Sequence, residues 1–594
     1  MIWTAVAMAE TGEIGQARGR DLTVPRPEGD SVSRFGLAMS FAQVPAAMLA
    51  PVVESRFGPA TSQPVFLVAP FVFVMLAAMF AALTIRELGG SIRTERTAIL
   101  LSTLAGPLGV YSALDASESL QAASLIVTLW ASVRAANATG ARAMRASAIA
   151  GLAAGVALLT KSSLLVVAPI AWLPFMVGRG RVGKLGVALV AFSVCGAIWL
   201  NSEIARFGSP LMGYAGESFS HSRLDGAWRL LTGVNKGLWF YFPALLFAAG
   251  RVPVLVRQRA SLSSLVRLSS IGVLFALLAL ASGWWAWHGD DGWGPRLLVP
   301  AVPLLAVSAA LVLETAGAGL RNTVLVVSVL ANVAPLLQHP TPVFHYRLSA
   351  AWPEADASFA NGLPRFAKRE IDGRTRAVPE AVLSTVRQAS PFIVLPWYFA
   401  ATHQSDATAR AAMLRQPPWL GARPDIAPAS AMVDAIATAP PRWRFWGRSL
   451  LAGEIDSASG AYDLGLADQV LRAQSLRSLA RAERLARKLI DLAPSGFADA
   501  LLLESFRLGN RRTEAVQYLN SLSPERRSHP AINVVLALFE RDRGNDEGAR
   551  AFLQSVLESY RDSPVERAIS QPLVLWPADL AAMTRDDRLQ VDIK

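Results

Sequence analysis

The chain has 594 residues, of which 52% are hydrophobic and 17% are charged, with a formal net charge of +12 and one cysteine. The charged fraction lies well below the roughly 25% of soluble globular domains, which argues against a soluble enzyme. In a soluble chain the positive charge would suggest a nucleic-acid partner. Here the arginines stand in short loops between apolar blocks, as the positive-inside rule predicts for membrane proteins. A single cysteine excludes an intrachain disulfide.

The first segment of the chain, residues 1–63, is expected to be an exoplasmic N-terminal segment. Within it, FGLAMSFAQVPAAMLAPVV (35–53) is amphipathic and is interrupted by Pro45 and Pro51. Because proline removes a helix hydrogen bond, this stretch favours a helix lying along the membrane surface over one that crosses it. An additional span is the alternative, and it would break the alternation of charged loops along the chain.

The segment 64–338 contains ten apolar blocks of about 16–22 residues, the length that a helix needs to cross a bilayer. We therefore expect a mainly α fold, a polytopic helical membrane bundle of about ten spans. The expected spans are 64–85, 97–113, 118–135, 146–160, 162–177, 184–200, 237–256, 265–285, 296–315 and 322–338.

Basic residues concentrate in every second loop between these blocks. Because cytoplasmic loops carry an excess of Lys and Arg, we assign the basic loops to the cytoplasm. The acidic and aromatic loops 113–119, 201–236 and 289–296 then lie on the exoplasmic side, and an even number of spans leaves both chain ends there. The cytoplasmic set comprises Arg86, Arg93, Arg96, Arg134, Arg142, Arg145, Arg179, Arg181, Lys184, Arg251, Arg257, Arg259, Arg267 and Arg321.

Hydropathy falls after residue 338. Residues 339–465 are rich in Pro, Ala and Trp and predict an exoplasmic region and linker, and residues 571–594 form a tail. Residues 466–570 show amphipathic helical patterns with a weak repeat of about 34 residues. This resembles tetratricopeptide (TPR) helix pairs and predicts a TPR-like exoplasmic domain that binds a protein partner, with an ordinary helical hairpin domain as the alternative. The repeat pairs Ala515 with Ala549, Leu519 with Leu553, and Pro530 with Pro564.

Acidic residues cluster on the expected exoplasmic side, and ionisable groups near a bilayer are costly enough to suggest function. Asp115 and Glu118 lie in a tight turn between two spans, and Asp290 and Asp291 lie in a Gly-rich loop flanked by tryptophans. We take these four as candidate catalytic residues, because a positioned carboxylate can deprotonate an acceptor hydroxyl. The structural alternatives are solvated turn residues and a hydrated turn beneath an interfacial aromatic belt.

Three cations lie on the same side. Arg296 opens a span, where its charge opposes the helix dipole and requires a compensating anion. A phosphate suits the guanidinium fork, with Asp290 or Asp291 as the structural alternative. With Lys236 and Lys161, Arg296 predicts a site for an amphipathic phosphorylated substrate, in which aromatic rings stack on a sugar. The remaining candidate substrate-binding residues are Tyr214, Tyr241, Trp285, His288 and Trp293.

Three sequence stretches matter through their order along the chain. They are RFGSPLMGY (206–214), KGLWFYFPALL (236–246) and WWAWHGDDGWGPRLLVPAVPLL (284–305), the last with a Trp-Gly-Pro-Arg element that ends at Arg296. This order resembles bacterial glycosyltransferases of the GT-C superfamily, which are related to protein mannosyltransferases and lipid A aminoarabinose transferases. The resemblance covers roughly the first 340 residues. It also includes SRFGLAMSFAQVPAAML (33–49) and the pair Ser117 and Glu118.

The resemblance implies an inverting membrane glycosyltransferase that moves a sugar from a polyprenyl-phosphate carrier to an exoplasmic glycan, lipid or protein acceptor. It implies a multi-pass protein of the bacterial inner (plasma) membrane with its site on the periplasmic side. Arg296 and Lys236 would hold the polyprenyl phosphate. The cofactor is unknown: no nucleotide is expected, and a divalent cation between a carboxylate and the phosphate is an open alternative. The implied partners are the lipid-linked sugar, the acceptor and membrane lipid, with no nucleic acid.

Two features depart from the family pattern. The family usually has Gly-Gly-Trp-Ser where this chain has Gly289-Asp290-Asp291-Gly292. The family also has a first span and an outer loop with an acidic base ahead of the stretch that MIWTAVAMAETGEIGQ (1–16) resembles. We expect a start codon that is assigned too late, in preference to a lost base. The acidic residues that follow do not match the position of the family's base; they are Glu10, Glu13, Asp21 and Asp30.

Other classes of site leave no clear pattern. The six histidines are scattered and there is one cysteine, so no zinc site is expected. RGRVGK (179–184) lacks the glycine spacing of a P-loop, which disfavours an ATP-driven pump. A transporter or flippase for a lipid-linked glycan remains an alternative, although its expected mid-membrane charges are few. A non-catalytic membrane scaffold with a helical binding domain is the third hypothesis.

Overall fold

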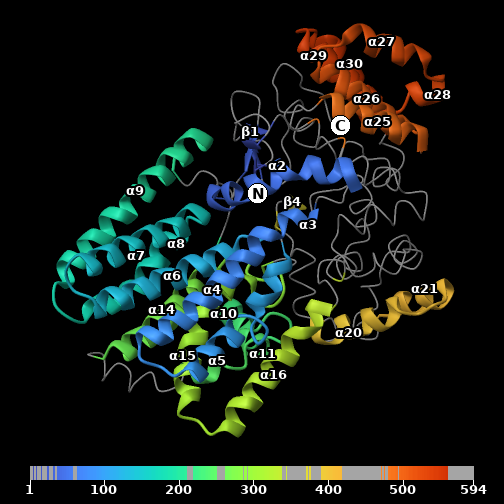
Figure 1. Ribbon diagram of the computed structural model, residues 1–594. Coiled ribbons are helices and arrows are strands. Elements are labelled where there is room, and N and C mark those ends of the chain that lie inside the picture. The colour runs from blue at the N-terminus through green and yellow to red at the C-terminus, as the bar shows by residue number, and fades with distance from the viewer. Residues whose placement is uncertain are drawn as a thin grey trace. The chain divides into compact units, whose positions relative to one another are not determined.

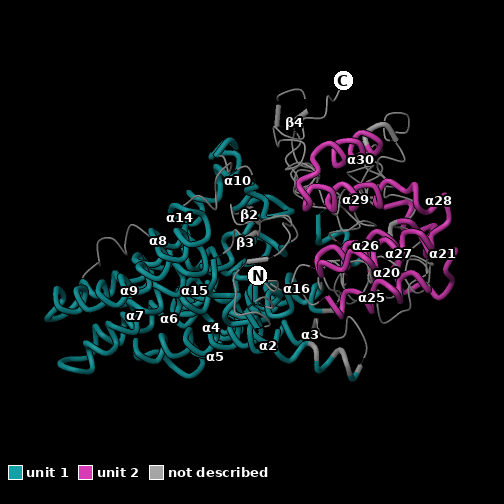
Figure 2. The backbone as a smooth tube through the Cα atoms, turned by 90° about the horizontal axis from the view of Figure 1, so that it is seen from above, with its two compact units in different colours: residues 1–9, 33–341, 380–396 teal, residues 10–32, 342–379, 397–594 magenta. Residues whose placement is uncertain are grey.

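The computed structural model shows a predominantly helical chain (Figure 1). It divides into two compact units: residues 1–9, 33–341 and 380–396 form the first, and residues 10–32, 342–379 and 397–594 form the second (Figure 2). The structure describes residues 4–5, 8–9, 15–16, 23–25, 31–33, 36–57, 63–114, 116–210, 219–249, 261–284, 286–289, 292–337, 343, 370–371, 374–375, 390–417, 470, 474, 479–492 and 494–559.

The first unit is a bundle of helices, several of which are interrupted by 3₁₀ segments (η). Its α-helices are α2 (Leu37–Phe57), α3 (Gln63–Phe66), α4 (Val68–Glu87), α5 (Ile92–Ser102), α6 (Glu118–Asn137), α7 (Gly140–Thr160), α8 (Leu164–Val167), α9 (Arg181–Phe207), α10 (Arg223–Thr232), α11 (Leu238–Tyr241), α12 (Leu245–Ala249), α14 (Leu262–Ser282), α15 (Val302–Glu314) and α16 (Ala318–Leu337). The 3₁₀ segments are η1 (Pro107–Ala113), η2 (Ala168–Met176) and η4 (Arg296–Ala301).

Six of these helices are long and apolar enough to cross a membrane, counting η4 and α15 as one: α4, α7, α9, α14, η4–α15 and α16. This is the pattern of a multi-pass membrane protein. The six coincide with the predicted spans 64–85, 146–160, 184–200, 265–285, 296–315 and 322–338. The prediction of about ten spans is not confirmed.

Within the described residues, the other four predicted spans do not form helices that are both long enough and apolar enough to meet this criterion, and each has a local reason. The block 118–135 is a full helix, α6, but it carries more polar residues. The block 97–113 is divided into α5 and η1, which begins at Pro107, and 162–177 is divided into α8 and η2, which contains Pro174. Proline lacks the N–H that continues a helix, so these segments tighten into 3₁₀ turns. The block 237–256 begins with α11 and α12, and its last residues lie outside the described ranges.

The predicted surface helix 35–53 is a helix, α2, and it runs through both of its prolines. The residue just before α2 is tightly packed: a Cβ at Gly36 would lie 2.2 Å from the carbonyl oxygen of Leu159 at the end of α7. Glycine is therefore required at this approach. The location of α2 in a membrane interface stays a prediction.

Helix α7 lies between α6 and α9, and the three run side by side in both views (Figures 1 and 2). Gly151 and Gly155 of α7 allow α9 to approach. A Cβ at Gly151 would lie 2.1 Å from the carbonyl oxygen of Ala188, and one at Gly155 would lie 2.3 Å from Cβ of Cys195. Small residues four apart on facing helices are a common means of close packing between spans.

Within the region predicted as a linker, the structure contains two helices, α20 (Pro391–Thr402) and α21 (Ala407–Arg415). Short strands also occur. β1 (Gly15–Gln16), β3 (Ser31–Ser33) and β2 (Thr23–Pro25) form a sheet in that order, and β4 (Glu370–Ile371) pairs antiparallel with β5 (Arg374–Thr375).

The C-terminal helices repeat with the predicted spacing. They are α25 (Leu479–Leu492), α26 (Gly496–Leu508), α27 (Arg512–Ser521), α28 (Pro524–Arg527), α29 (Pro530–Asp542) and α30 (Asp546–Ser559). The starts of α26 and α29 are 34 residues apart, and so are those of α27 and α30. The two turns correspond as well, because Asn510 and Gly544 both adopt positive φ, at 55° and 73°. The helical repeat is therefore regular, and its assignment to the TPR class stays a prediction.

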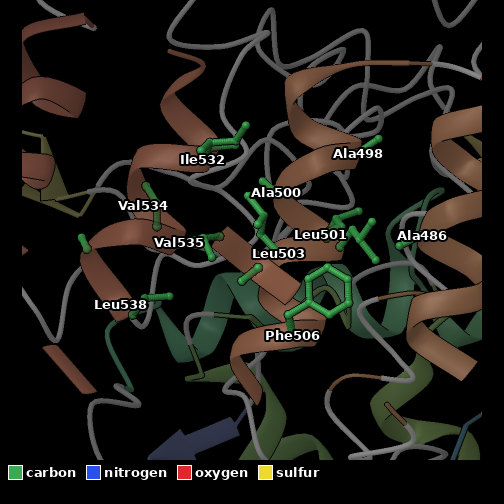
Figure 3. Close-up of a cluster of buried hydrophobic side chains, with 14 of the residues drawn as sticks. Ala486, Ala498, Ala500, Leu501, Leu503, Phe506, Ile532, Val534, Val535 and Leu538 are labelled. Carbon is green, nitrogen blue, oxygen red and sulfur yellow. The ribbon is translucent and has the colours of Figure 1, made fainter. Parts of the chain in front are cut away.

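These helices close over a core of their own (Figure 3). Phe506 and Leu501 of α26 face Val535 and Leu538 of α29, and all four are almost fully buried. Ala515 and Ala549, which the repeat places in equivalent positions, are buried in the same cluster. Small residues at these positions allow the successive helices to stack closely.

Candidate functional site

The first candidate pair comes from two helices that begin at the same end of the bundle. Glu118 is in the first turn of α6, and Arg296 is the first residue of η4. The Arg296 Nε donates to Oε1 of Glu118 at 2.7 Å, and the two side chains are 20% and 4% exposed. Sequence analysis expected a phosphate, or Asp290 or Asp291, as the anion beside Arg296; in the structure Glu118 is an anion in that position. The other carboxylate oxygen, Oε2, is buried and has no hydrogen-bond partner among the residues that the structure describes.

The turn before Arg296 is built around Gly292. A Cβ there would lie 2.6 Å from Cβ of Arg296 and 2.7 Å from the hydroxyl of Tyr111, so only glycine fits. The ammonium of Lys236 donates to the Gly292 carbonyl at 2.8 Å, and the Tyr111 hydroxyl donates to the carbonyl of Trp293 at 3.0 Å. These contacts place Lys236 at the same turn as Arg296.

Aromatic residues pack directly beneath this turn. The rings of Tyr241 and Trp293 lie edge to face with centroids 5.1 Å apart, an arrangement that aromatic pairs prefer. Asn332 of α16 joins them: it accepts from Nε1 of Trp293 at 3.2 Å and donates to the carbonyl of Tyr241 at 2.8 Å. Phe392, at the start of α20, packs against Tyr241 with centroids 4.8 Å apart. Tyr241 and Trp293 thus have structural roles in addition to any contact with substrate.

His288 is fully buried just beyond these residues. Burial, followed by electrostatic interactions with Lys236 and His221, lowers the pKa of His288 to about 3. The imidazole is therefore neutral at physiological pH.

Another group of polar residues, His221, Asp225 and Arg229, lies around Trp287. His221 stacks on the indole with centroids 5.3 Å apart, and its Nε2 lies 3.0 Å from Oδ2 of Asp225. The Arg229 Nε donates to the same carboxylate oxygen at 2.7 Å. The pKa of Asp225 is held below its ordinary value, chiefly by the hydrogen bond from Arg229. Sequence analysis missed this group, although the spacing of four between the three residues is a signal for one helix face.

Lys161 follows α7 and lies with its ammonium 5.9 Å from the ring centroid of Trp284. This cation–π contact joins the end of α7 to the end of α14. Sequence analysis placed Lys161 on the side of the candidate site, and the structure connects it to Trp284, which adjoins the loop containing Trp287 and His288.

Five of the candidate residues fall outside the described ranges: Asp115, Tyr214, Trp285, Asp290 and Asp291. Within those ranges there is no cluster of three or more His, Cys, Asp or Glu that could hold a metal ion. Residues that sequence analysis did not single out, yet which contact the candidate ones, are Tyr111, Asn332 and Phe392. Each stands in an apolar stretch whose composition gives no hint of its contacts.

The other end of the same helices has its own ion pairs. Arg86 donates to Glu95 at 2.7 Å and Arg134 to Glu87 at 3.4 Å, while Glu314 at the end of α15 accepts from the amide of Ser91. The loops assigned to the cytoplasm and those assigned to the exoplasmic side therefore meet at different ends of α4, α6 and α15.

Comparison with protein-family models, with curated proteins and with solved structures finds no match. The resemblance to GT-C glycosyltransferases is therefore carried by the quoted motifs alone.

Proposed function

We propose that the protein is an inverting GT-C-type glycosyltransferase that uses a polyprenyl-phosphate-linked sugar. The observation that carries the proposal is the convergence of Glu118, Arg296 and Lys236 at one end of a multi-pass bundle. A buried acid paired with Arg296, with Lys236 bonded to the turn before Arg296 and packed aromatic rings beside it, suits a substrate with an apolar chain, a phosphate and a sugar.

In the proposed reaction, an acceptor hydroxyl attacks the anomeric carbon of the sugar. The new C–O bond forms while the bond to the phosphate oxygen breaks, and polyprenyl phosphate leaves with the electron pair. Arg296 and Lys236 stabilise the charge that develops on the phosphate. The proton of the hydroxyl passes to a carboxylate, and the candidates for this base are Glu118, Asp115, Asp290 and Asp291.

Glu118 also holds Arg296 in place. Arginine presents five N–H donors in a planar fork, and the bond from Nε to Glu118 fixes the plane of that fork. A preorganised fork costs little further entropy when it binds phosphate. A lysine at this position would keep the charge and lose the fixed geometry, which makes Arg296→Lys the informative variant.

The test uses the full-length protein in lipid nanodiscs, supplied with a panel of polyprenyl-phosphate-linked hexoses and pentoses and with envelope extract from the host cell as acceptor. Release of polyprenyl phosphate is measured. We expect release with at least one sugar and a loss of about 10²-fold in Arg296→Lys, the size typical of removing one charge-stabilising donor.

The control is Arg86→Lys, because Arg86 also pairs with a buried glutamate, Glu95, but at the other end of the bundle and with its own side chain exposed. This variant should keep the wild-type rate. No release with any sugar, or equal rates for Arg296→Lys and wild type, would contradict the proposal.

A further inference from the structure

Helix α10 has two unlike faces. Gly226 and Leu230 are buried and turn toward α14, and a Cβ at Gly226 would lie 2.1 Å from the carbonyl oxygen of Ser282. The amide of His221 also donates to the carbonyl of Gly283 at 3.1 Å. The helix is therefore pressed against the C-terminal end of α14 and lies beside it in both views (Figures 1 and 2).

The polar flank of α10 is satisfied within the protein. Ser222 caps the helix by accepting from the amide of Asp225, and Asp225 in turn bonds Arg229 and His221. The guanidinium of Arg229 lies 6.0 Å from the ring centroid of Trp287. This flank brings the paired charges of Asp225 and Arg229 to the loop around Trp287.

The remaining face is apolar and exposed. Leu224 is 85% exposed and Trp228, one turn later, is 68% exposed; Phe219 just ahead of the helix is 62% exposed. Residues four apart share a helix face, so Leu224 and Trp228 form a single stripe opposite Gly226 and Leu230. Isolated exposed apolar residues need no explanation, but a stripe this large on one short helix does.

Its position indicates what covers the stripe. Helix α14 is one of the six apolar helices, and its end at Ser282 marks where that helix would leave the hydrocarbon core. Helix α11, which contacts α10, also carries exposed aromatic rings: Trp239 is 45% exposed and Phe240 is 39% exposed. Tryptophan concentrates at the boundary between acyl chains and headgroups, where its ring is apolar and its N–H is wet.

We propose that α10 is an interfacial helix that lies in the lipid headgroup region at this end of the bundle, with Leu224 and Trp228 inserted toward the acyl chains. The stripe continues the lipid-facing surface of the spans, and the helix has the amphipathic character of membrane-surface helices. Its opposite flank holds the His221–Asp225–Arg229 cluster beside Trp287. This inference is independent of the proposed enzyme activity.

The experiment measures the depth of single spin labels in nanodiscs of phosphatidylcholine and phosphatidylglycerol. Cys195 is the single cysteine of the chain, so Cys195→Ser provides a background without thiols. Labels are attached to Leu224→Cys and Trp228→Cys, and collisions with oxygen, which enters lipid, are compared with collisions with a water-soluble nickel complex. Both positions are exposed, so the substitutions leave the packing intact, which melting temperatures verify.

Two reference positions calibrate the depth scale. Val190 is 69% exposed on the apolar helix α9 and serves as the lipid reference, while the exposed Gln517 on α27 serves as the aqueous one. We expect the oxygen-to-nickel collision ratio at 224 and 228 to be several-fold above that at 517 and to approach that at 190.

A ratio at 224 and 228 equal to that at 517 would show that the stripe faces water and would overturn the proposal. An immobilised label that neither reagent reaches would show that protein covers the stripe, and this would also overturn it.

Discussion

At the scale of single residues, the pairing of Glu118 with Arg296 has two consequences. It brings a carboxylate and a guanidinium that are far apart in the sequence into contact at the starts of α6 and η4. It also means that neither residue can be removed without leaving a charge in a mostly buried environment. Loss of activity in a simple alanine variant would therefore report folding as well as chemistry.

We predict that Arg296→Ala lowers the free energy of unfolding by about 3 kcal/mol, because it leaves the Glu118 carboxylate buried without its cation. The double variant Glu118→Gln with Arg296→Gln should recover part of that loss, since no lone charge remains. Melting temperatures in detergent measure both. The control is Arg543→Ala, which removes an exposed pair with Glu540 and should cost less than about 1 kcal/mol. Equal effects at both pairs would contradict the prediction.

The buried His288 predicts a dependence of stability on pH. Its pKa is about 3 in the folded protein and 6.5 for the unperturbed side chain, so the unfolded state binds a proton that the folded state does not. The stability that this group contributes is complete above pH 6.5 and is lost as the pH falls from there toward 3. Between about pH 6.5 and pH 5 the loss is about 2 kcal/mol.

The measurement is the melting temperature of wild type and His288→Asn across that range. The wild-type melting temperature should fall on acidification, and the variant should show a shallower dependence. If both curves have the same slope, the acid sensitivity does not come from His288.

At the scale of elements, apolar block length predicted the positions of six membrane-length helices. It did not predict where helices break. Block length is insensitive to the prolines that turn 97–113 and 162–177 into α-helix followed by 3₁₀ turns. Block length also failed to predict α20, because a short apolar helix inside a Pro-rich region has too few residues to show a helical period of hydrophobicity.

The contact between α7 and α9 gives a prediction about glycine. Gly151→Ala introduces a methyl group 2.1 Å from the carbonyl oxygen of Ala188, so the helices must separate, and we expect a loss of about 1–3 kcal/mol. Gly196 of α9 is also helical but has no atom within 4 Å of an added Cβ, so Gly196→Ala should be neutral or slightly stabilising. Thermal unfolding in detergent distinguishes the two. A destabilised Gly196→Ala beside an unaffected Gly151→Ala would reverse the packing argument.

At the scale of the whole molecule, the sequence predicted which loops share an end of the bundle but not which side chains touch. Glu118, Arg296 and Lys236 could be assigned to one side from the alternation of basic loops alone. Their contacts depend on tertiary packing, and so do those of Tyr111 and Asn332, which stand in predicted spans, and of Phe392, which stands in the predicted exoplasmic region. The repeat of about 34 residues, by contrast, was visible in the sequence, because equivalent buried alanines and turn residues recur at that spacing.

Among the described residues, the core of the C-terminal helices is built from residues between Val470 and Val556, which predicts that residues 466–570 fold as a separate fragment. Asp499 is fully buried in it and is held by Arg526, whose Nε donates at 2.8 Å, and by the hydroxyl of Tyr518 at 2.6 Å. We expect the isolated fragment to be helical and water-soluble and to unfold cooperatively in urea, followed by far-ultraviolet circular dichroism.

Within that fragment, Asp499→Asn should lower the free energy of unfolding by about 3 kcal/mol, because Arg526 and Tyr518 lose a shared buried anion. Asp542→Asn is the matched control: its carboxylate is 44% exposed in the pair with Arg507, and its loss should cost less than about 1 kcal/mol. A fragment that aggregates or unfolds without a cooperative transition would mean that other parts of the chain complete this core. A fragment that folds but tolerates both substitutions equally would mean that the buried ion pair adds nothing to the stability of the repeat.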